Sequence, residues 1–429
     1  MKHTIRQARR LSGHIKVPGD KSISHRAIMM GALAKGVTEI TGFLMGEDCL
    51  NTISCFQQLG INIDICGDSC VRVYGKGLHG LEKPIRRLDA GNSGTTCRIL
   101  LGILAGQTFD SELTGDDSLR RRPMSRVVTP LNMMGAVIEG ADGGNHLPLK
   151  IKGRPLHGIR YQLPVASAQL KSSLIMAGLF TDSPTHIHEP VPSRDHTELM
   201  LSSFGGNLKK QGDIITVEPV KELYGQSISI PGDISSAAFF ITAALIIPDS
   251  QVRISNVGVN PTRTGILDVL RDMGASIILE NHRTYGGEPV ADLLVRYTPL
   301  KGTTIQGSII PRLIDEIPIL AVAAAFAEGT TVIKDAEELR FKESNRIDAV
   351  VQELSKMGVD IAGTPDGMII HGGRPLRGSV VADYMDHRIS MAMAVAALAT
   401  TGETVIQGSE YINISYPGFF ETLDGIISQ

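Results

Sequence analysis

VPGDKS, at Val17–Ser22, returns as IPGDIS at Ile230–Ser235, 213 positions later in a chain of 429 residues. Two further patterns recur along the chain with a similar spacing. Leu-x-Gly stands ahead of a strand-like segment at intervals of 67 to 78 residues, at Leu11, Leu78, Leu156, Leu223, Leu300 and Leu376. Glycines follow helix-like patterns at Gly60, Gly135, Gly205, Gly274 and Gly358, and Gly425 is expected to close a truncated sixth pattern. Fixed-period similarity is the mark of repeated structural units, so the chain is predicted to hold six repeats, three in each half.

Each repeat is predicted to form a strand, an apolar helix, another strand, an amphipathic helix ending in glycine, and a pair of strands. Segments such as MGASIILE, at 273–280, carry the β-branched residues of a strand after a glycine at a helix end. The predicted class is α/β. The period exceeds that of ordinary solenoids, which favours two similar globular lobes of three stacked repeats.

The first helix of each repeat is apolar nearly all round, as in AAFFITAALII at 237–247 and SMAMAVAALA at 390–399. A helix without a polar face is buried. Polar residues remain only where these helices begin. Because a helix N-terminus offers free N–H groups and partial positive charge, we expect several such ends to bind anionic ligands.

Composition limits the class of protein. Hydrophobic residues make up 42% of the chain, and 42 basic against 45 acidic residues leave a formal charge of -3. A folded protein is expected, and the basic excess of a general nucleic-acid binder is missing. The five cysteines form no CxxC pair and are interpreted as reduced thiols of a cytoplasmic protein. No apolar run is long enough to cross a membrane, and MKHTIRQARR lacks the apolar region of a signal peptide.

Cationic and hydrogen-bonding residues cluster at the predicted helix starts. GDKSISHR, at 19–26, and DAGNSGTTCR, at 89–98, open two of the apolar helices, and LRRRPMSR, at 119–126, places Pro123 at the first position of another helix. The candidates for binding phosphate or carboxylate groups are Lys21, Ser22, Arg26, Gly94, Arg122, Ser167, Gln169, Arg194, Lys342, Arg346 and Arg388. Each alone is equally explained as a helix cap or a solvated charge.

Two carboxylates are candidates for acid–base chemistry. Asp315 precedes the apolar helix through IPILAVAAAFA, at 317–327, and Glu343 stands three residues before Arg346. A capping aspartate and a surface i, i+3 ion pair are the ordinary alternatives. All the candidates fall at helix starts in both halves, so they converge if the lobes face each other. That composition predicts a small, multiply anionic ligand pair with proton transfer between positioned carboxyl groups, and no cofactor or metal.

The motifs together resemble a known family. GDKSISHR, GNSGTTCR, the RP after a basic turn, SAQ, SRDHTE, FKESNR and DHR are similar, in this order, to those of the bacterial 3-phosphoshikimate 1-carboxyvinyltransferases, the enolpyruvylshikimate phosphate synthases. The resemblance spans nearly the whole chain. It implies two lobes of three βαβαββ units, each an inside-out α/β barrel with buried helices, and an active site in the cleft between them. The implied lobes are 21–229 for repeats 1–3, and 1–20 with 230–429 for repeats 4–6.

The implied reaction moves the enolpyruvyl group of phosphoenolpyruvate to the 5-hydroxyl of shikimate 3-phosphate and expels inorganic phosphate. Asp315 would accept the hydroxyl proton and Glu343 would protonate the methylene carbon, and the catalytic Lys21 would contact both substrates. Shikimate 3-phosphate would be bound by Lys21, Ser22, Arg26, Ser167, Gln169, Arg194, Asp315 and Lys342, and phosphoenolpyruvate by Lys21, Gly94, Arg122, Gln169, Arg346 and Arg388. No cofactor, nucleic acid or membrane is implied.

Some features depart from parts of the family. Another branch carries a lysine two residues before an aromatic-Pro pair near the C-terminus, where this chain has Ile414 before Tyr416 and Pro417. Some members have alanine where this chain has Gly94, so ordinary sensitivity to the inhibitor glyphosate is expected. We also expect a monomer.

Two alternatives remain open from the sequence. The related transferase acting on UDP-N-acetylglucosamine has Lys-Asn in place of Lys21-Ser22 and usually a loop cysteine, which 110–122 lacks. A non-catalytic sensor of phosphorylated metabolites would have no use for Asp315 and Glu343.

Overall fold

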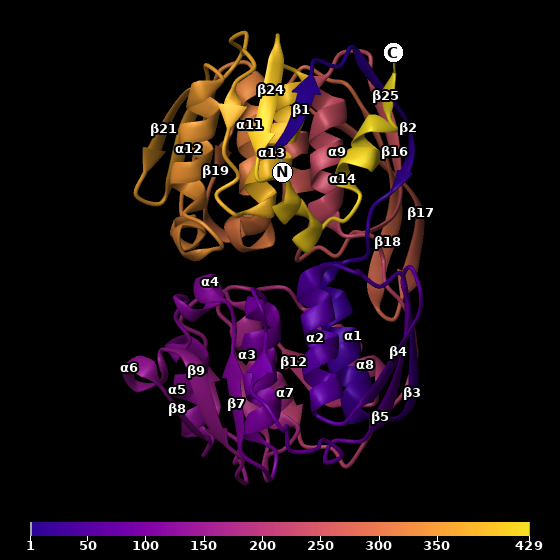
Figure 1. Cartoon of the computed structure of the whole chain (residues 1–429), viewed down its shortest axis with the longest axis vertical. Helices are drawn as coiled ribbons and strands as arrows, with labels where there is room; N and C mark the ends of the chain where they lie inside the picture. The colour runs from indigo at the N-terminus through magenta and orange to yellow at the C-terminus, as the bar shows by residue number, and fades with distance from the viewer. Residues whose placement is uncertain (1, 429) are drawn as a thin grey trace. The chain divides into compact units, whose positions relative to one another are not determined.

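The computed structural model describes residues 2–428 and divides them into two compact units. Unit 1 comprises residues up to Pro18 together with Pro231–Thr284 and residues from Pro289 onward. Unit 2 comprises Gly19–Ile230 and Tyr285–Glu288. Figure 1 draws unit 2 in indigo to rose, and unit 1 mainly in orange and yellow with the indigo N-terminal strands.

The elements of unit 2 follow the predicted alternation of strands and helices. They are α1 (Lys21–Leu33), β3 (Ala34–Thr41), α2 (Glu47–Gln58), β4 (Asn62–Gly67), β5 (Cys70–Lys76), β6 (Leu88–Asp89), α3 (Gly94–Ala105), β7 (Ser111–Thr114), α4 (Asp117–Arg120), α5 (Ser125–Met133), β8 (Val137–Gly140), α6 (Ala141–Gly144), β9 (His146–Lys152), β10 (Arg160–Gln162), α7 (Ala168–Gly178), β11 (Thr185–His188), α8 (His196–Ser203), β12 (Asn207–Gln211), β13 (Ile214–Glu218), β14 (Leu223–Tyr224) and β15 (Ser227–Ser229).

Unit 1 begins with the first two strands and resumes after β15. Its elements are β1 (Lys2–Arg6), β2 (Arg10–Lys16), α9 (Ile234–Ile246), β16 (Gln251–Gly258), α10 (Gly265–Asp272), β17 (Ser276–Tyr285), β18 (Glu288–Arg296), β19 (Thr304–Ile305), η1 (Gly307–Arg312), η2 (Ile314–Glu316), α11 (Ile317–Phe326), β20 (Thr330–Ile333), η3 (Glu337–Phe341), α12 (Arg346–Lys356), β21 (Asp360–Thr364), β22 (Gly367–His371), β23 (Val380–Val381), α13 (His387–Leu398), β24 (Glu403–Gln407), η4 (Ser409–Ile414), α14 (Phe419–Asp424) and β25 (Ile427–Ser428).

The sheets repeat one pattern. In each of the orders β6-β7-β9-β8, β10-β11-β13-β12 and β19-β20-β22-β21, the first pair is parallel and the others are antiparallel. In the first repeat, the strands parallel to β3 are β14 and β15, which come from the end of the third repeat. In the fourth repeat, the strand parallel to β16 is β2. The short sixth repeat takes its antiparallel strand from the chain start, where β1 pairs with β24 (Figure 1).

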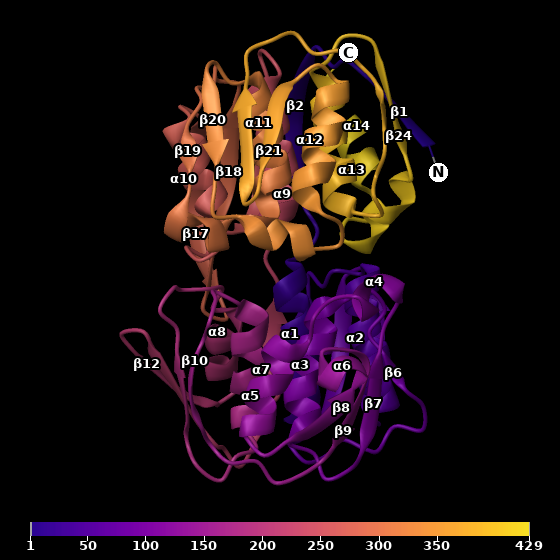
Figure 2. The same ribbon diagram turned by 90° about the vertical axis from the view of Figure 1, so that its left-hand side faces the viewer.

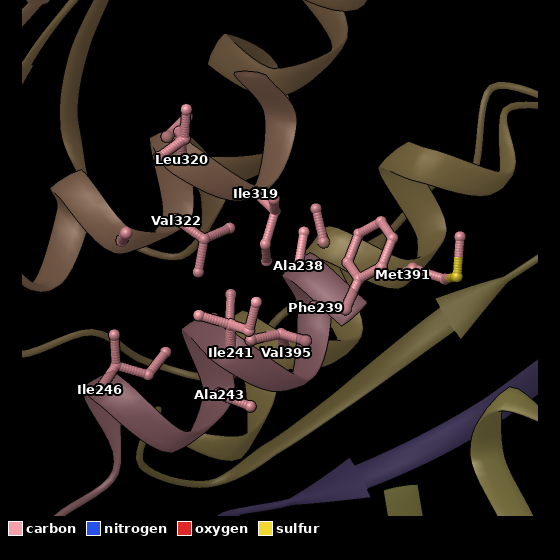
Figure 3. Close-up of a cluster of buried hydrophobic side chains, with 14 of the residues drawn as sticks. Ala238, Phe239, Ile241, Ala243, Ile246, Ile319, Leu320, Val322, Met391 and Val395 are labelled. Carbon is pink, nitrogen blue, oxygen red and sulfur yellow. The ribbon is translucent and has the colours of Figure 1, made fainter. Parts of the chain in front are cut away.

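The six apolar helices lie where the sequence predicts them, as α1, α3, α7, α9, α11 and α13, and nearly all of their residues are buried. In unit 1, side chains of α9, α11 and α13 interdigitate, including Phe239, Ile319 and Met391 (Figure 3). In unit 2, α3 packs against α1 and α7. Truncating one buried phenylalanine of such a core to alanine costs about 3 to 5 kcal/mol.

The α/β class and the two units with buried helices are confirmed. The strands of the described residues form three separate sheets in each unit, one for each of the three predicted repeats, around the buried helices. The helix-ending glycines Gly60, Gly135, Gly205, Gly274 and Gly358 all have positive φ, as expected where a helix stops in a left-handed residue. Gly425 does not follow this pattern, since its φ is -64°.

Candidate active site

The first helix of unit 2 carries Lys21 and Arg26 five positions apart in its first two turns, with Asp20 capping the helix by accepting from the Ile23 amide. Lys21 Nζ lies 3.1 Å from Asp48 Oδ2, so an acidic partner from α2 holds the ammonium in place. The Arg26 guanidinium is buried and donates to Thr197 Oγ1 at 2.6 Å and to Ser172 Oγ at 2.8 Å. Burial lowers the pKa of Arg26 to about 10, which still leaves it cationic at neutral pH.

His25, between these two cations in the chain, links α1 to the neighbouring helices. Its Nδ1 lies 2.6 Å from Thr52 Oγ1 of α2, and Thr52 Oγ1 lies 2.6 Å from Thr96 Oγ1 of α3. Burial, followed by the charges of Lys21 and Arg26, lowers the pKa of His25 well below its usual value. The ring is therefore neutral and adds no charge to this end of α1.

The start of α3 places two guanidinium groups beside a glycine. Ser93 caps the helix, and Arg122 Nη2 donates to Asn92 Oδ1 at 2.8 Å. A Cβ on Gly94 would lie 3.0 Å from Arg98 Nη1 and 3.5 Å from Arg122 Nη1. An alanine here would require the Arg98 guanidinium to shift by a few tenths of an ångström, whereas its distance to Arg122 is an ordinary contact.

The expected position of Pro123 is wrong. The helix after the basic turn begins at Ser125, with Met124 as its N-cap, so Pro123 lies outside it. The Pro123 carbonyl accepts from Arg98 Nη2 at 3.2 Å, which ties the turn carrying Arg122 to α3.

The start of α7 lies beside the same helix. Ser167 caps α7 through the Leu170 amide, and Gln169 donates to Thr95 Oγ1 at 3.0 Å while accepting from Arg98 Nη1 at 2.7 Å. Gln169 thus joins the α3 and α7 ends, as predicted of residues that meet at helix starts.

Arg194 lies in the loop before α8. A buried cluster of charged side chains holds this loop in place. Lys171 Nζ of α7 has no exposed surface and lies 2.9 Å from Glu189 and 2.7 Å from Glu198, and it also donates to the Ser193 carbonyl. Burial raises the pKa of Glu198 despite the nearby Lys171. The cluster holds the backbone on both sides of Arg194.

In unit 1, Asp315 lies in the short η2 turn that leads into α11. Its Oδ1 is 3.2 Å from Arg346 Nη1 and 3.7 Å from Lys342 Nζ. The backbone carbonyl of Asp315 accepts from Arg388 Nη1 at 3.1 Å. Asp315 is therefore held by cations from two other segments and is not a simple cap of α11.

Arg346 connects the carboxylates of the candidate residues in unit 1. Its guanidinium is buried and contacts Glu343 Oε2 at 2.6 Å and Asp386 Oδ2 at 2.8 Å, besides Asp315. Burial alone would lower the pKa of Arg346, but the three carboxylates raise it instead. The pair of Glu343 and Arg346 is thus part of a buried network, not the surface ion pair that spacing alone suggests.

Asp386 joins Arg346 to the start of α13. It is the N-cap residue of α13 and accepts from the Arg388 amide at 3.0 Å. Burial tends to raise the pKa of Asp386, but Arg346 outweighs it and the net shift is downward. A charged Asp386 therefore binds the guanidinium of Arg346 and the backbone amide of Arg388, two of the three arginines that the resemblance assigns to phosphoenolpyruvate.

The candidates divide between the two units. In unit 2 these are Lys21, Ser22, Arg26, Gly94, Arg122, Ser167, Gln169 and Arg194, and in unit 1 they are Asp315, Lys342, Glu343, Arg346 and Arg388. Sequence reasoning missed Asp48, Arg98 and Lys171 as supporting groups. Arg98 stood at the end of a quoted motif, whereas nothing in the spacing marks Asp48 as the partner of Lys21.

The chain matches known proteins over its whole length. Residues 5–423 match the family model described as EPSP synthase (3-phosphoshikimate 1-carboxyvinyltransferase). The chain belongs to this family. A 3-phosphoshikimate 1-carboxyvinyltransferase of Thermoanaerobacter sp. (strain X514) is 57% identical over 98% of this chain and 99% of its own, and one of Bacillus cytotoxicus is 52% identical over 98% and 99%. The solved EPSP synthase of Acinetobacter baumannii is 43% identical, with a TM-score of 0.89 over 100% of this chain and 99% of that chain.

Family membership settles the class of reaction. The protein is a transferase, and its function is the enolpyruvyl transfer of the shikimate pathway, in aromatic amino acid biosynthesis. Within residues 2–428 no helix is long and apolar enough to cross a membrane. The same residues hold no group of three or more His, Cys, Asp or Glu side chains placed to bind a metal ion.

Proposed function

We propose that the residues of both sets serve one reaction, in which phosphoenolpyruvate gives its enolpyruvyl group to the 5-hydroxyl of shikimate 3-phosphate and inorganic phosphate leaves. The observation that carries this proposal is the buried Arg346, which holds Asp315 and Glu343 within 3.2 Å of one guanidinium. Two carboxylates fixed in this way suit a reaction that needs one proton accepted and another delivered.

The first step requires opposite roles of the two carboxyl groups. Glu343 donates a proton to C3 of phosphoenolpyruvate, C2 gains cationic character, and the 5-hydroxyl oxygen attacks C2 while Asp315 accepts the hydroxyl proton. The second step reverses the proton movement at C3. The C–O bond to phosphate breaks and C3 returns a proton to Glu343. Asp315 passes the hydroxyl proton to the leaving phosphate, so the enolpyruvyl ether and inorganic phosphate are the products and both carboxyl groups return to their starting states.

The cations bind the anionic groups of the substrates. Arg122 and Gly94 of unit 2, with Arg346 and Arg388 of unit 1, suit the phosphate and carboxylate of phosphoenolpyruvate, because guanidinium groups pair with both in a bidentate manner. Shikimate 3-phosphate would contact Ser22, Arg26, Ser167, Gln169, Arg194 and Lys342. Lys21 would act with both substrates.

Other properties are part of the same proposal. One chain supplies every proposed contact, so the protein acts as a monomer, which light scattering would check against the mass of a dimer. The five free cysteines, three of them buried, suit a reducing compartment, and we place the enzyme in the cytoplasm.

The test is release of inorganic phosphate by the purified protein, in EDTA, from phosphoenolpyruvate with either of two acceptors. Release with shikimate 3-phosphate alone is expected. Release only with UDP-N-acetylglucosamine would show that the reading of Lys21 and Ser22 is wrong. If a folded protein released no phosphate with either acceptor, this result would favour a non-catalytic sensor and contradict the proposal.

A further inference from the structure

The backbone directly before Asp386 adopts a conformation that its residues disfavour. The Asp386 amide donates to the Asp383 carbonyl at 2.9 Å, which closes a four-residue turn. The two central residues, Tyr384 and Met385, have φ values of +54° and +56°. Turns with positive φ at both central positions are dominated by Gly, Asn and Asp, because a larger L-residue crowds its own backbone there. Contacts outside the turn must therefore stabilise it.

Glu353 of α12 supplies those contacts. Its carboxylate is fully buried and accepts from Tyr384 Oη at 2.6 Å, from the Ala382 amide at 3.1 Å and from Lys356 Nζ at 2.7 Å. Burial, together with the Glu353 carboxylate, raises the pKa of Tyr384, so the phenol stays protonated and remains a donor. Glu353 thus binds one residue before the turn and one within it.

The same helix also binds the residue after the turn. Arg346, seven positions before Glu353 and so on the same face of α12, donates to Asp386 Oδ2 at 2.8 Å. The helices α12 and α13 lie next to each other in unit 1 (Figure 2). Asp386 in turn accepts from the Arg388 amide. A shift of the turn would therefore move Asp386, the Arg346 guanidinium that it binds, and the backbone that carries the Arg388 side chain.

We propose that Glu353 and Tyr384 are positioning residues for phosphoenolpyruvate: their hydrogen bond holds the 383–386 turn in its left-handed conformation and thereby aims Arg346 and Arg388. They act through Asp386. The inference rests on the proposed function, since it assumes that these two arginines bind phosphoenolpyruvate.

The first test is Tyr384→Phe, which removes only the phenolic donor. The KM for phosphoenolpyruvate is expected to rise about tenfold, while the KM for shikimate 3-phosphate stays within about twofold. Tyr74→Phe is the matched control, because Tyr74 Oη also donates to a carboxylate, Asp64 Oδ2 at 3.0 Å, but on the exposed surface of unit 2. Both KM values of that control are expected to stay unchanged.

A rescue separates positioning from general loss of structure. Glycine adopts positive φ without steric cost, so Met385→Gly removes the strain at one of the two central positions and lessens the need for the Tyr384 hydrogen bond. Met385→Gly alone is expected to keep normal kinetics, and added to Tyr384→Phe it is expected to restore the KM for phosphoenolpyruvate to within about twofold of the parent. An unchanged KM in Tyr384→Phe, an equal loss for both substrates, or a failed rescue would each overturn the inference.

Arg388→Lys, measured in parallel, separates this inference from the proposed function. If it raises the KM for phosphoenolpyruvate while Tyr384→Phe does not, the positioning role fails and the proposed function stands. If Arg388→Lys leaves that KM unchanged, the assigned binding role of Arg388 fails, and the inference fails with it.

Discussion

Arg346 Nε lies 2.8 Å from Asp386 Oδ2 although 40 positions separate the two residues, and both side chains are buried. Asp386 also caps α13, so one carboxylate joins the start of α12 to the start of α13. Two helix starts that lie far apart in sequence are thereby fixed in one geometry.

Asp386→Ala is expected to destabilise the fold as well as the site. Removing one partner leaves a buried guanidinium short of compensating charge, which costs about 3 kcal/mol. Chemical denaturation would measure the loss. Ser344→Ala removes a different hydrogen bond to the same Asp386 oxygen and is expected to cost about 1 kcal/mol. Equal stability of Asp386→Ala and the parent would contradict this account of the ion pair.

Neutralising either proposed proton-transfer group should remove most of the activity. Asp315→Asn and Glu343→Gln are each expected to lower kcat at least ~10²-fold, because a positioned acid or base contributes about that much to a proton transfer. Asp348→Asn is the control, since Asp348 lies on the same helix start but is exposed. A kcat within tenfold of the parent in either of the first two variants would refute the assigned role.

Gly94→Ala should weaken the binding of both phosphoenolpyruvate and glyphosate. The added methyl group would lie 3.0 Å from Arg98 Nη1, closer than most carbon atoms approach, so the Arg98 guanidinium must shift by a few tenths of an ångström and the space at this helix start becomes smaller. Steady-state kinetics should show competition between glyphosate and phosphoenolpyruvate in the parent, and a higher KM and a higher inhibition constant in the variant. A parent that shows no such competition at millimolar glyphosate would overturn the expectation of ordinary sensitivity.

His25 should make the protein less stable in mild acid. Its pKa is lowered in the folded state, so below the ordinary histidine pKa of about 6.5 the unfolded chain binds a proton that the folded chain does not. Stability therefore falls as the pH drops from 6.5 towards the folded pKa, by up to ~1.4 kcal/mol per pH unit. Urea titrations of His25→Gln should show a shallower decline. The exposed His282→Gln is the control, and an identical decline in His25→Gln would refute the argument.

The cysteines should differ in reactivity. Burial raises the pKa of the Cys55 and Cys97 thiols to about 12, and Cys49 is buried too, whereas Cys66 is exposed. A chromogenic thiol reagent should modify Cys66 first and leave the buried three unreacted until the protein unfolds. Cys66→Ser should remove the fast phase without changing kcat. Fast labelling of Cys97 in the native protein would contradict the packing around α3.

The periodic features of the fold could be predicted from the sequence because each has a local cause. An all-apolar run such as 237–247 must be buried, and Gly274 with φ of +96° ends its helix as such glycines do. The order of the strands within each sheet could not be predicted in this way. It depends on pairing between distant strands, as when β1 joins β24, and no local pattern records that partnership.

The site could be predicted where a motif carried charge at a helix start, as at Lys21 and Arg346. Supporting residues escaped because their significance is three-dimensional. Glu353 looks like one more surface acid on an amphipathic helix, and only the turn at Tyr384 shows why its carboxylate is buried. Asp48 gains its meaning only when α2 packs beside α1.

The most direct test of the central claim follows the proton that Glu343 is proposed to deliver. In D₂O, with phosphoenolpyruvate and shikimate 3-phosphate, C3 becomes a methyl group holding one deuteron and then loses one hydrogen. Mass spectrometry should therefore find deuterium in the vinyl methylene of the product of the parent enzyme. We predict that Glu343→Gln forms this labelled methylene at least ~10²-fold more slowly. Labelling at the parent's rate in Glu343→Gln would contradict the account.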